Sequence, residues 1–141
     1  MKVSLVSSVS PELDELWRRA HRDVVAKRGG PALLKTLGDT GHEGDLLAAL
    51  VTSSSFWIAT EKGELKGFGI LRGGVVEAIY VSPESRRQKV ATALVKTLLA
   101  SDTPPLDAYA LPGDRAMKSL YESLGWKARL LTMRGVSPGD E

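Results

Sequence analysis

Apolar residues recur along this chain with two different spacings, and each spacing predicts a different kind of element. After Ser10 and Pro11, a capping hydroxyl followed by a proline suited to the first helical position, apolar residues return every three or four positions until Gly29 and Gly30. This pattern predicts a long first helix. The same spacing predicts helices over residues 45–52, 88–100 and 114–124, and one or two helical turns over residues 31–37.

Short apolar runs bounded by turn residues predict strands. These runs are residues 3–6, 56–60, 65–71, 75–81, 106–111 and 126–133. Strands and helices in this order predict an α/β or α+β fold, a sheet with helices on its faces. No linker or repeat interrupts the pattern, so we expect one domain over residues 1–133, followed by a frayed polar tail over residues 134–141.

Composition narrows the class of protein. The chain has 141 residues and a net charge of only +2, which does not favour nucleic-acid binding. It has no cysteine, which excludes disulfides, thiolate zinc sites and cysteine nucleophiles, and its two histidines make a histidine-rich metal site unexpected. No apolar run reaches the roughly 20 residues that a membrane span needs. We therefore expect a cytoplasmic protein with no metal and no contact with a membrane.

Positive charge gathers between the strand over residues 75–81 and the helix that follows it. Arg86, Arg87 and Lys89 lie where the helix begins, although the positive end of a helix dipole disfavours cations by ~0.3–1 kcal/mol each. A bound phosphate removes this conflict, because free N–H groups at a helix N-terminus bind anions. The pattern predicts an anionic ligand here, and the alternative is a solvated run of surface charge.

Two sequence motifs resemble the GNAT N-acetyltransferase superfamily. From Glu77 the chain reads EAIYVSPESRRQKVATAL, which is similar to the family's strand–loop–helix acetyl-CoA motif, Q/R-x-x-G-x-G/A. From Ala116 it reads AMKSLYESLGW, which resembles the family's late helix ending in Y-E-x-x-G-F. The resemblance implies a mixed, mostly antiparallel central sheet of six or seven strands flanked by about four helices.

The resemblance also implies how acetyl-CoA, as co-substrate, would be held. Backbone N–H groups of the loop and the helix start would bind the pyrophosphate, Val81 would offer main-chain bonds to pantetheine, and Arg86 fills the Q/R position. The residues assigned to the acetyl-CoA site are Ile79, Tyr80, Val81, Arg86, Arg87, Gln88, Lys89, Val90, Ala91, Thr92 and Asp114. The chain departs from the motif at Lys89, which replaces the central glycine. Its side chain either turns outward and supplies charge or crowds the pocket.

Two residues are candidates for the chemistry. Tyr121 matches the family's general acid, and a phenol of pKa about 10 suits the protonation of a departing thiolate; the alternative is a core aromatic. Glu77 is expected to share one face of its strand with Ile79 and Val81, where it would accept a proton from the amine, directly or through water, or orient it. The alternative for Glu77 is an edge charge or a salt-bridge partner. Asp114 has an N-cap as its simpler explanation.

The sequence therefore predicts an acetyl-CoA-dependent N-acetyltransferase in which a primary amine of a small molecule or protein attacks the thioester directly. The alternative is a catalytically inactive acyl-CoA-binding or protein-interaction module with the same fold. A small nucleotide-binding protein is a third possibility, but the chain has neither a G-x-G-x-x-G helix start nor a phosphate loop of the G-x-x-x-x-G-K-[ST] type. Members of the family often dimerise, so a homodimer is compatible with the resemblance.

Overall fold

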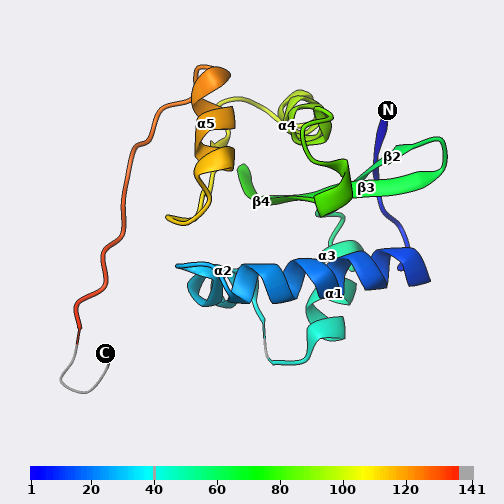
Figure 1. The fold of residues 1–141 in the computed structure, drawn as a ribbon, viewed down its shortest axis with the longest axis horizontal. Coiled ribbons are helices and arrows are strands. Elements are labelled where there is room, and N and C mark those ends of the chain that lie inside the picture. The colour runs from blue at the N-terminus through cyan, green and yellow to red at the C-terminus, as the bar shows by residue number, and fades with distance from the viewer. Residues whose placement is uncertain (40, 137–141) are drawn as a thin grey trace.

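The computed structural model describes residues 1–39 and 41–136, which form a sheet with helices on both faces (Figure 1). The strands are β1 (Lys2–Leu5), β2 (Phe56–Glu61), β3 (Glu64–Arg72), β4 (Val75–Val81) and β5 (Asp107–Ala108). The helices are α1 (Pro11–Val25), α2 (Gly30–Leu37), α3 (Glu43–Thr52), the short 3-10 turn η1 (Pro83–Ser85), α4 (Val90–Ala100) and α5 (Arg115–Ser123). The predicted mixed α+β class is confirmed.

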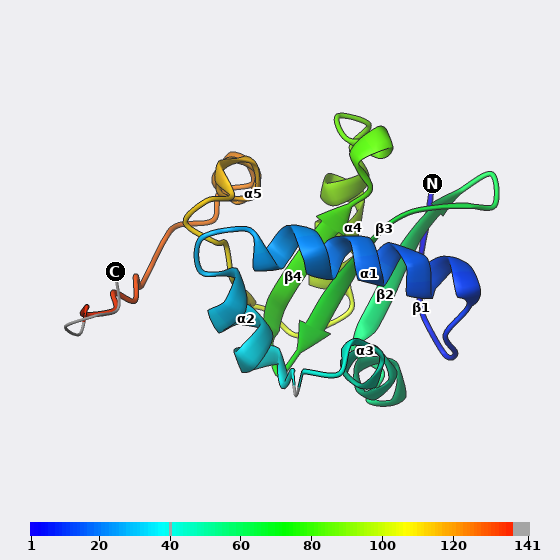
Figure 2. The same ribbon diagram turned by 60° about the horizontal axis from the view of Figure 1, so that its bottom comes forward.

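The five strands follow one another across the sheet in sequence order, and Figure 2 shows β1 to β4 side by side. Each neighbouring pair is antiparallel except β4 and β5, which are parallel. β5 pairs only with Val75 and Val76, at the start of β4. In the described part of the chain, the rest of β4 therefore has no strand beside it on that edge.

Helices α1, α2 and α3 cover one face of the sheet, and α4 covers the other (Figures 1 and 2). On the first face, Trp17 of α1 packs edge-on against Phe56 of β2, with ring centroids 5.9 Å apart, and Phe56 stacks on Phe68 of β3 at 4.7 Å. On the second face, Leu94 and Leu98 of α4 are fully buried against the strands. These two apolar layers hold β4 rigidly between α1 and α4.

Local signals explain most helix ends. The Ser10 hydroxyl accepts a hydrogen bond from the Leu13 N–H at 3.1 Å and caps α1, as predicted. Glycine is needed at the start of α2, because a Cβ on Gly30 would collide with the carbonyl oxygen of Val24. The turns predicted over residues 31–37 are the helix α2, and the helix predicted over residues 45–52 begins two residues earlier as α3.

The C-terminal part of the sheet is smaller than predicted. The strand predicted over residues 106–111 pairs only at Asp107 and Ala108, because Pro112 and Gly113 then turn the chain into α5. The strand predicted over residues 126–133 is not formed, because so short a β5 leaves it no ladder to join. Its Leu130 and Met133 are exposed. The described residues thus form five strands rather than six or seven, and the tail beyond residue 136 lies outside them.

None of the helices in the described part has the length and apolar character of a membrane span.

Candidate functional site

The loop between β4 and α4 has the backbone of an anion-binding turn. After η1, both Arg87 and Lys89 adopt left-handed conformations, with φ of 64° and 63°. Lys89 then precedes α4 and provides no side-chain cap for its first turn. The N–H groups of that turn are therefore available to an anion. The helix predicted from residue 88 begins instead at Val90, since the left-handed Lys89 cannot continue a right-handed helix.

The backbone of Lys89 explains the family's glycine at this position. A φ of 63° is costly for a residue with a Cβ and free for glycine. Lys89 therefore keeps the glycine-like turn and adds a cation to it. Its side chain is exposed.

This geometry predicts that Lys89→Gly stabilises the protein. Removing the left-handed strain should raise the free energy of unfolding by ~0.5–1 kcal/mol, after the greater entropy of glycine in the unfolded chain is counted. Chemical denaturation measures the change. Lys96→Gly, at an exposed position inside α4, is the matched control and should lower stability by about 1 kcal/mol. Equal destabilisation by both substitutions would contradict the interpretation of Lys89.

A cavity of about 780 Å³ opens between the end of β4, the start of α4 and the start of α5. The predicted residues that line it are Ile79, Tyr80, Val81, Arg86, Arg87, Lys89, Val90, Ala91, Thr92 and Asp114. Three predicted residues, Gln88, Glu77 and Tyr121, are not part of its lining. The Gln88 amide instead lies 3.5 Å from the main-chain oxygen of Glu84.

The opposite wall of the cavity comes from the start of α5 and from Lys27 in the turn after α1, which the sequence reasoning missed. The missed lining residues are Lys27, Ser85, Gly113, Arg115, Ala116, Met117 and Leu120. Asp114 caps α5, since its Oδ1 accepts a hydrogen bond from the Met117 N–H at 3.2 Å. Its Oδ2 lies 3.5 Å from Nζ of Lys27. The one lining carboxylate is thus paired, while Arg86, Arg87, Lys89 and Arg115 give the cavity a surplus of positive charge.

The end of β4 carries Tyr80, whose buried ring lies against Phe68 with centroids 5.6 Å apart. Its hydroxyl donates a hydrogen bond of 2.7 Å to Oδ2 of Asp23 on α1. Burial, together with this bond, raises the pKa of Tyr80 to about 12, so the phenol keeps its proton. The guanidinium of Arg86 lies 5.9 Å from the centre of the Tyr80 ring, and its Nε donates to the Val81 carbonyl at 3.3 Å. The Tyr80 ring therefore lies beside the guanidinium of Arg86, one of the cations of the loop.

Tyr121 lies beneath the α5 wall rather than on its surface. The side chain is buried, and its ring stacks on Trp126 with centroids 5.0 Å apart. Within the described residues its hydroxyl is buried and has no hydrogen-bond partner. Burial raises the pKa of Tyr121 above its usual value, so the phenol is protonated at neutral pH. Leu120, the preceding residue, does line the cavity.

Glu77 lies on a different face from the one predicted. The register of β3 and β4 shifts so that Ile70 pairs with Ala78 and Leu71 with Val76, which leaves Glu77 as an extra residue in a β-bulge. Ile79 and Val81 pack toward α4, whereas Glu77 lies beside the end of α2, on the opposite face. The strict alternation that placed all three on one face is therefore wrong.

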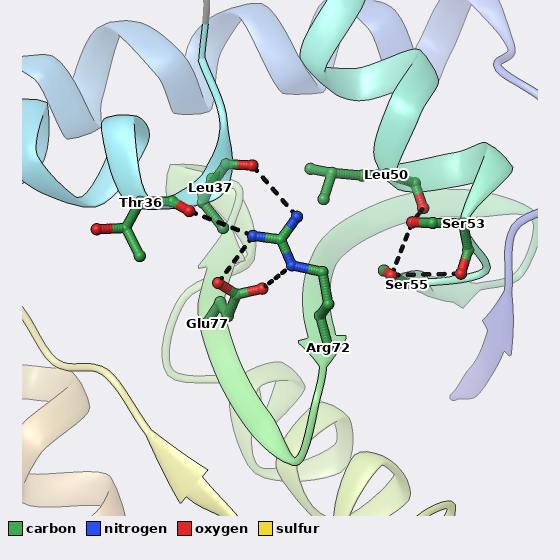
Figure 3. A network of polar contacts seen from close by, with 7 residues as sticks. All are labelled: Thr36, Leu37, Leu50, Ser53, Ser55, Arg72 and Glu77. Atoms are coloured by element: carbon green, nitrogen blue, oxygen red, sulfur yellow. Dashed lines mark hydrogen bonds and ion pairs between the residues drawn. The ribbon is translucent and has the colours of Figure 1, made fainter.

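At the bulge, the Glu77 carboxylate forms a two-pronged ion pair with Arg72 (Figure 3). The Arg72 Nε and Nη2 lie 2.7 and 3.1 Å from its two oxygens. The same guanidinium donates to the main-chain oxygens of Leu37 and Thr36, each at 3.3 Å. The salt-bridge alternative for Glu77 is thus present in the structure.

Among the described residues, no three His, Cys, Asp or Glu side chains gather in a way that would hold a metal ion.

Comparison with known proteins places this arrangement in a family. The sequence model of the family described as acetyltransferase (GNAT) domain matches residues 52–128, more than half of the chain. No curated protein sequence gives a significant match.

Solved structures share the fold. An aminoglycoside 6'-N-acetyltransferase from Acinetobacter haemolyticus superposes with a TM-score of 0.61 at 14% identity, covering 97% of this chain and 98% of that one. The ribosomal-protein-S18-alanine N-acetyltransferase from Escherichia coli has a TM-score of 0.57 at 19% identity, with 88% and 77% covered. An aminoglycoside N-acetyltransferase, AAC(6')-Iy, in complex with CoA, has a TM-score of 0.56 at 17% identity, with 95% of each chain covered.

Proposed function

Because the chain belongs to the GNAT acetyltransferase family, we propose that it binds acetyl-CoA in the cavity beside β4 and transfers the acetyl group to a primary amine. The observation that carries the proposal is the meeting of three features in one loop. These are an uncapped start of α4, a backbone that turns left-handed twice, and the cations Arg86, Arg87 and Lys89 along the cavity. Together they suit a diphosphate.

The remaining parts of acetyl-CoA find partners along the same cavity. The edge of β4 from Ile79 to Val81 has no strand beside it in the described part of the chain, so its main-chain groups other than the Val81 carbonyl, which accepts from Arg86, are available to the amides of pantetheine. An N–H group near Val81 is then placed to polarise the thioester carbonyl. The cavity is lined by the cationic loop on one side and by the start of α5 on the other.

The proposed reaction is a direct transfer. The amine nitrogen attacks the thioester carbonyl carbon, a C–N bond forms, and the C–S bond breaks. The nitrogen gives up one proton to water, and CoA leaves as a thiolate that takes up a proton. Holding both reactants in one cavity supplies much of the acceleration. Tyr121 is the proposed proton donor, since its phenol is protonated and has no partner of its own in the described structure.

The acceptor is a small molecule or a protein that bears a primary amine. Structural neighbours include enzymes named for aminoglycosides and one named for the alanine of a ribosomal protein. At identities below 25% these likenesses support the fold and leave both classes of acceptor as candidates. Acceptors of both classes should therefore be tested.

A second candidate function is an acyl-CoA-binding module without turnover. Two observations favour it: Glu77 is held by Arg72, and Tyr121 does not line the cavity. Such a module would bind acetyl-CoA through the same loop but would lack groups that take and give protons.

Two measurements on the full chain distinguish these functions. Calorimetric titration with acetyl-CoA should show saturable binding at one site. Release of free thiol from acetyl-CoA should then be followed with aminoglycosides and with peptides that begin with alanine. Binding with release by one acceptor supports the transferase, and binding without release by any of them supports the module. If millimolar acetyl-CoA does not bind, both proposals are wrong.

A further inference from the structure

Three charged residues, two on α1 and one in the turn that follows it, reach three different parts of the candidate acetyl-CoA site. Arg19 and Asp23 are four residues apart and lie on the same face of α1, and Lys27 follows in the turn after Val25, the last residue of the helix. We call these three residues the α1 row. Figure 2 shows α1 crossing the sheet toward α5.

Arg19 contacts η1, the short turn that precedes the cationic loop of Arg86, Arg87 and Lys89. Its two terminal nitrogens, Nη1 and Nη2, lie 3.0 and 2.9 Å from the carboxylate oxygens of Glu84 in η1. This forked pairing fixes direction as well as distance. The Arg19 guanidinium lowers the pKa of Glu84 to about 2, so the pair stays charged at neutral pH. η1 is followed directly by Arg86 and Arg87, so the contact links α1 to the cationic loop.

Asp23 contacts the end of β4. Its Oδ2 accepts the 2.7 Å hydrogen bond from the Tyr80 hydroxyl. Tyr80 lines the cavity and supports the guanidinium of Arg86. Asp23 itself is exposed, and its contact with the buried Tyr80 is a hydrogen bond at the rim of the core.

Lys27 contacts the opposite wall. Its Nζ lies 3.5 Å from Oδ2 of Asp114, the capping residue of α5. Tyr121 is the buried residue of α5, so this helix has little apolar packing to fix its distance from β4. The contact between Lys27 and Asp114 therefore helps to set the distance between α5 and β4 across the cavity.

Isolated surface ion pairs contribute little to stability, with typical values of ~0–1 kcal/mol. The α1 row is better explained by the location of its three partners, which all lie at one cavity. Each of the three partners, Glu84, Tyr80 and Asp114, belongs to or adjoins the wall of one cavity. Arg19 and Asp23 come from a helix outside the motif that forms this cavity, and Lys27, in the turn after that helix, is itself a lining residue.

We propose that Arg19, Asp23 and Lys27 are positioning residues that hold the two walls of the cavity at the separation acetyl-CoA requires. This inference rests on the proposed function and adds a role for α1 in the affinity for the co-substrate. The row acts through Glu84, Tyr80 and Asp114.

The test measures the affinity of the full chain for acetyl-CoA by calorimetry. Asp23→Ala removes the acceptor of the Tyr80 hydrogen bond and should raise the Kd about tenfold, the scale expected for a hydrogen bond to a charged group. Asp23→Asn keeps a carbonyl oxygen for the Tyr80 hydroxyl and should stay within about twofold of the wild type. In turnover, Asp23→Ala should raise the KM for acetyl-CoA and leave kcat within about twofold.

A double-variant cycle tests whether Asp23 acts through Tyr80. Tyr80→Phe should weaken binding about as much as Asp23→Ala, and the double variant should bind no more weakly than either single variant. Asp14→Ala is the matched control, since Asp14 also lies on α1 but pairs with Arg18 of the same helix at 2.9 Å. Its Kd should equal that of the wild type.

Each outcome has a distinct meaning. An unchanged Kd in folded Asp23→Ala, with or without a lower Tm, assigns the row to stability alone and overturns the inference while leaving the proposed function intact. Additive losses in the double variant also overturn it, because Asp23 would then act independently of Tyr80. Absence of acetyl-CoA binding in the wild type overturns the proposed function as well, and it is visible before any variant is made.

Discussion

Tyr121→Phe should reduce the rate of acetyl transfer at least about a hundredfold and leave the protein as stable as before, or more stable by up to ~1 kcal/mol. Loss of a general acid slows the departure of the thiolate, and catalysis of this kind contributes about 10²–10⁴-fold. Stability should not fall, because the hydroxyl that is removed is buried without a hydrogen-bond partner in the described structure. The ring, with its stacking on Trp126, remains.

The combination of the two results makes this prediction specific. A phenol that serves only the core should lose nothing in rate when its hydroxyl is removed. A general acid must instead keep its proton until the thiolate appears, and the raised pKa of Tyr121, caused by burial, ensures this. In the proposed role, the unpartnered hydroxyl would meet the departing sulfur as its hydrogen-bond acceptor.

Thiol release measures the rate, and thermal unfolding measures the stability. Tyr109→Phe is the matched control, because Tyr109 is 44% exposed and follows β5 outside the cavity lining. This control should change neither quantity. Full activity in Tyr121→Phe would leave Tyr121 as a core aromatic, the alternative that the sequence also allowed.

Local signals in the sequence are sufficient for the helices and the long strands. The capping serine and proline define the start of α1, and the three- or four-residue spacing defines α4 and α5 to within a few residues. The error at residues 126–133 has a different origin. A strand forms only beside a partner strand. The apolar residues of this segment do not indicate that its possible partner, β5, is only two residues long.

The two walls of the cavity also differ in how far the sequence predicts them. The loop from Arg86 to Thr92 is continuous in sequence, so its charges and its likeness to the family motif were readable before the fold was known. The contact between Lys27 and Asp114 joins residues 87 positions apart, and no local pattern indicates it. The sequence also did not indicate on which face of the sheet the Glu77 side chain lies, since a single-residue bulge reverses the alternation on which the prediction depended.

Glu77 is therefore the residue for which structure and family resemblance make different predictions. Its side chain is 6% exposed and its partner Arg72 is 40% exposed, so the carboxylate depends on this guanidinium for its compensation. Arg72 also donates to two carbonyls at the C-terminal end of α2, groups that a helix cannot satisfy internally. One side chain thus joins α2, β3 and β4.

Arg72→Met should consequently lower the free energy of unfolding by ~2–4 kcal/mol, since it leaves a buried carboxylate and two helix-end carbonyls without their donor. The double variant Arg72→Met/Glu77→Gln should recover part of this loss, because the uncompensated charge is gone. Chemical denaturation measures both. Glu64→Gln, which removes the 74% exposed partner of Lys66, should change stability by less than about 1 kcal/mol.

The rate of the folded enzyme then decides the role of Glu77. If the carboxylate is structural, Glu77→Gln should keep kcat within about threefold wherever the protein is folded, with an unchanged dependence of rate on pH. If it accepts the proton of the amine, kcat should fall about a hundredfold or more and the acidic limb of the pH–rate profile should disappear. The bulge, the opposite face and the two-pronged bond to Arg72 favour the first result, because a carboxylate held in that way has neither the position nor the free oxygens to reach an amine beside Val81.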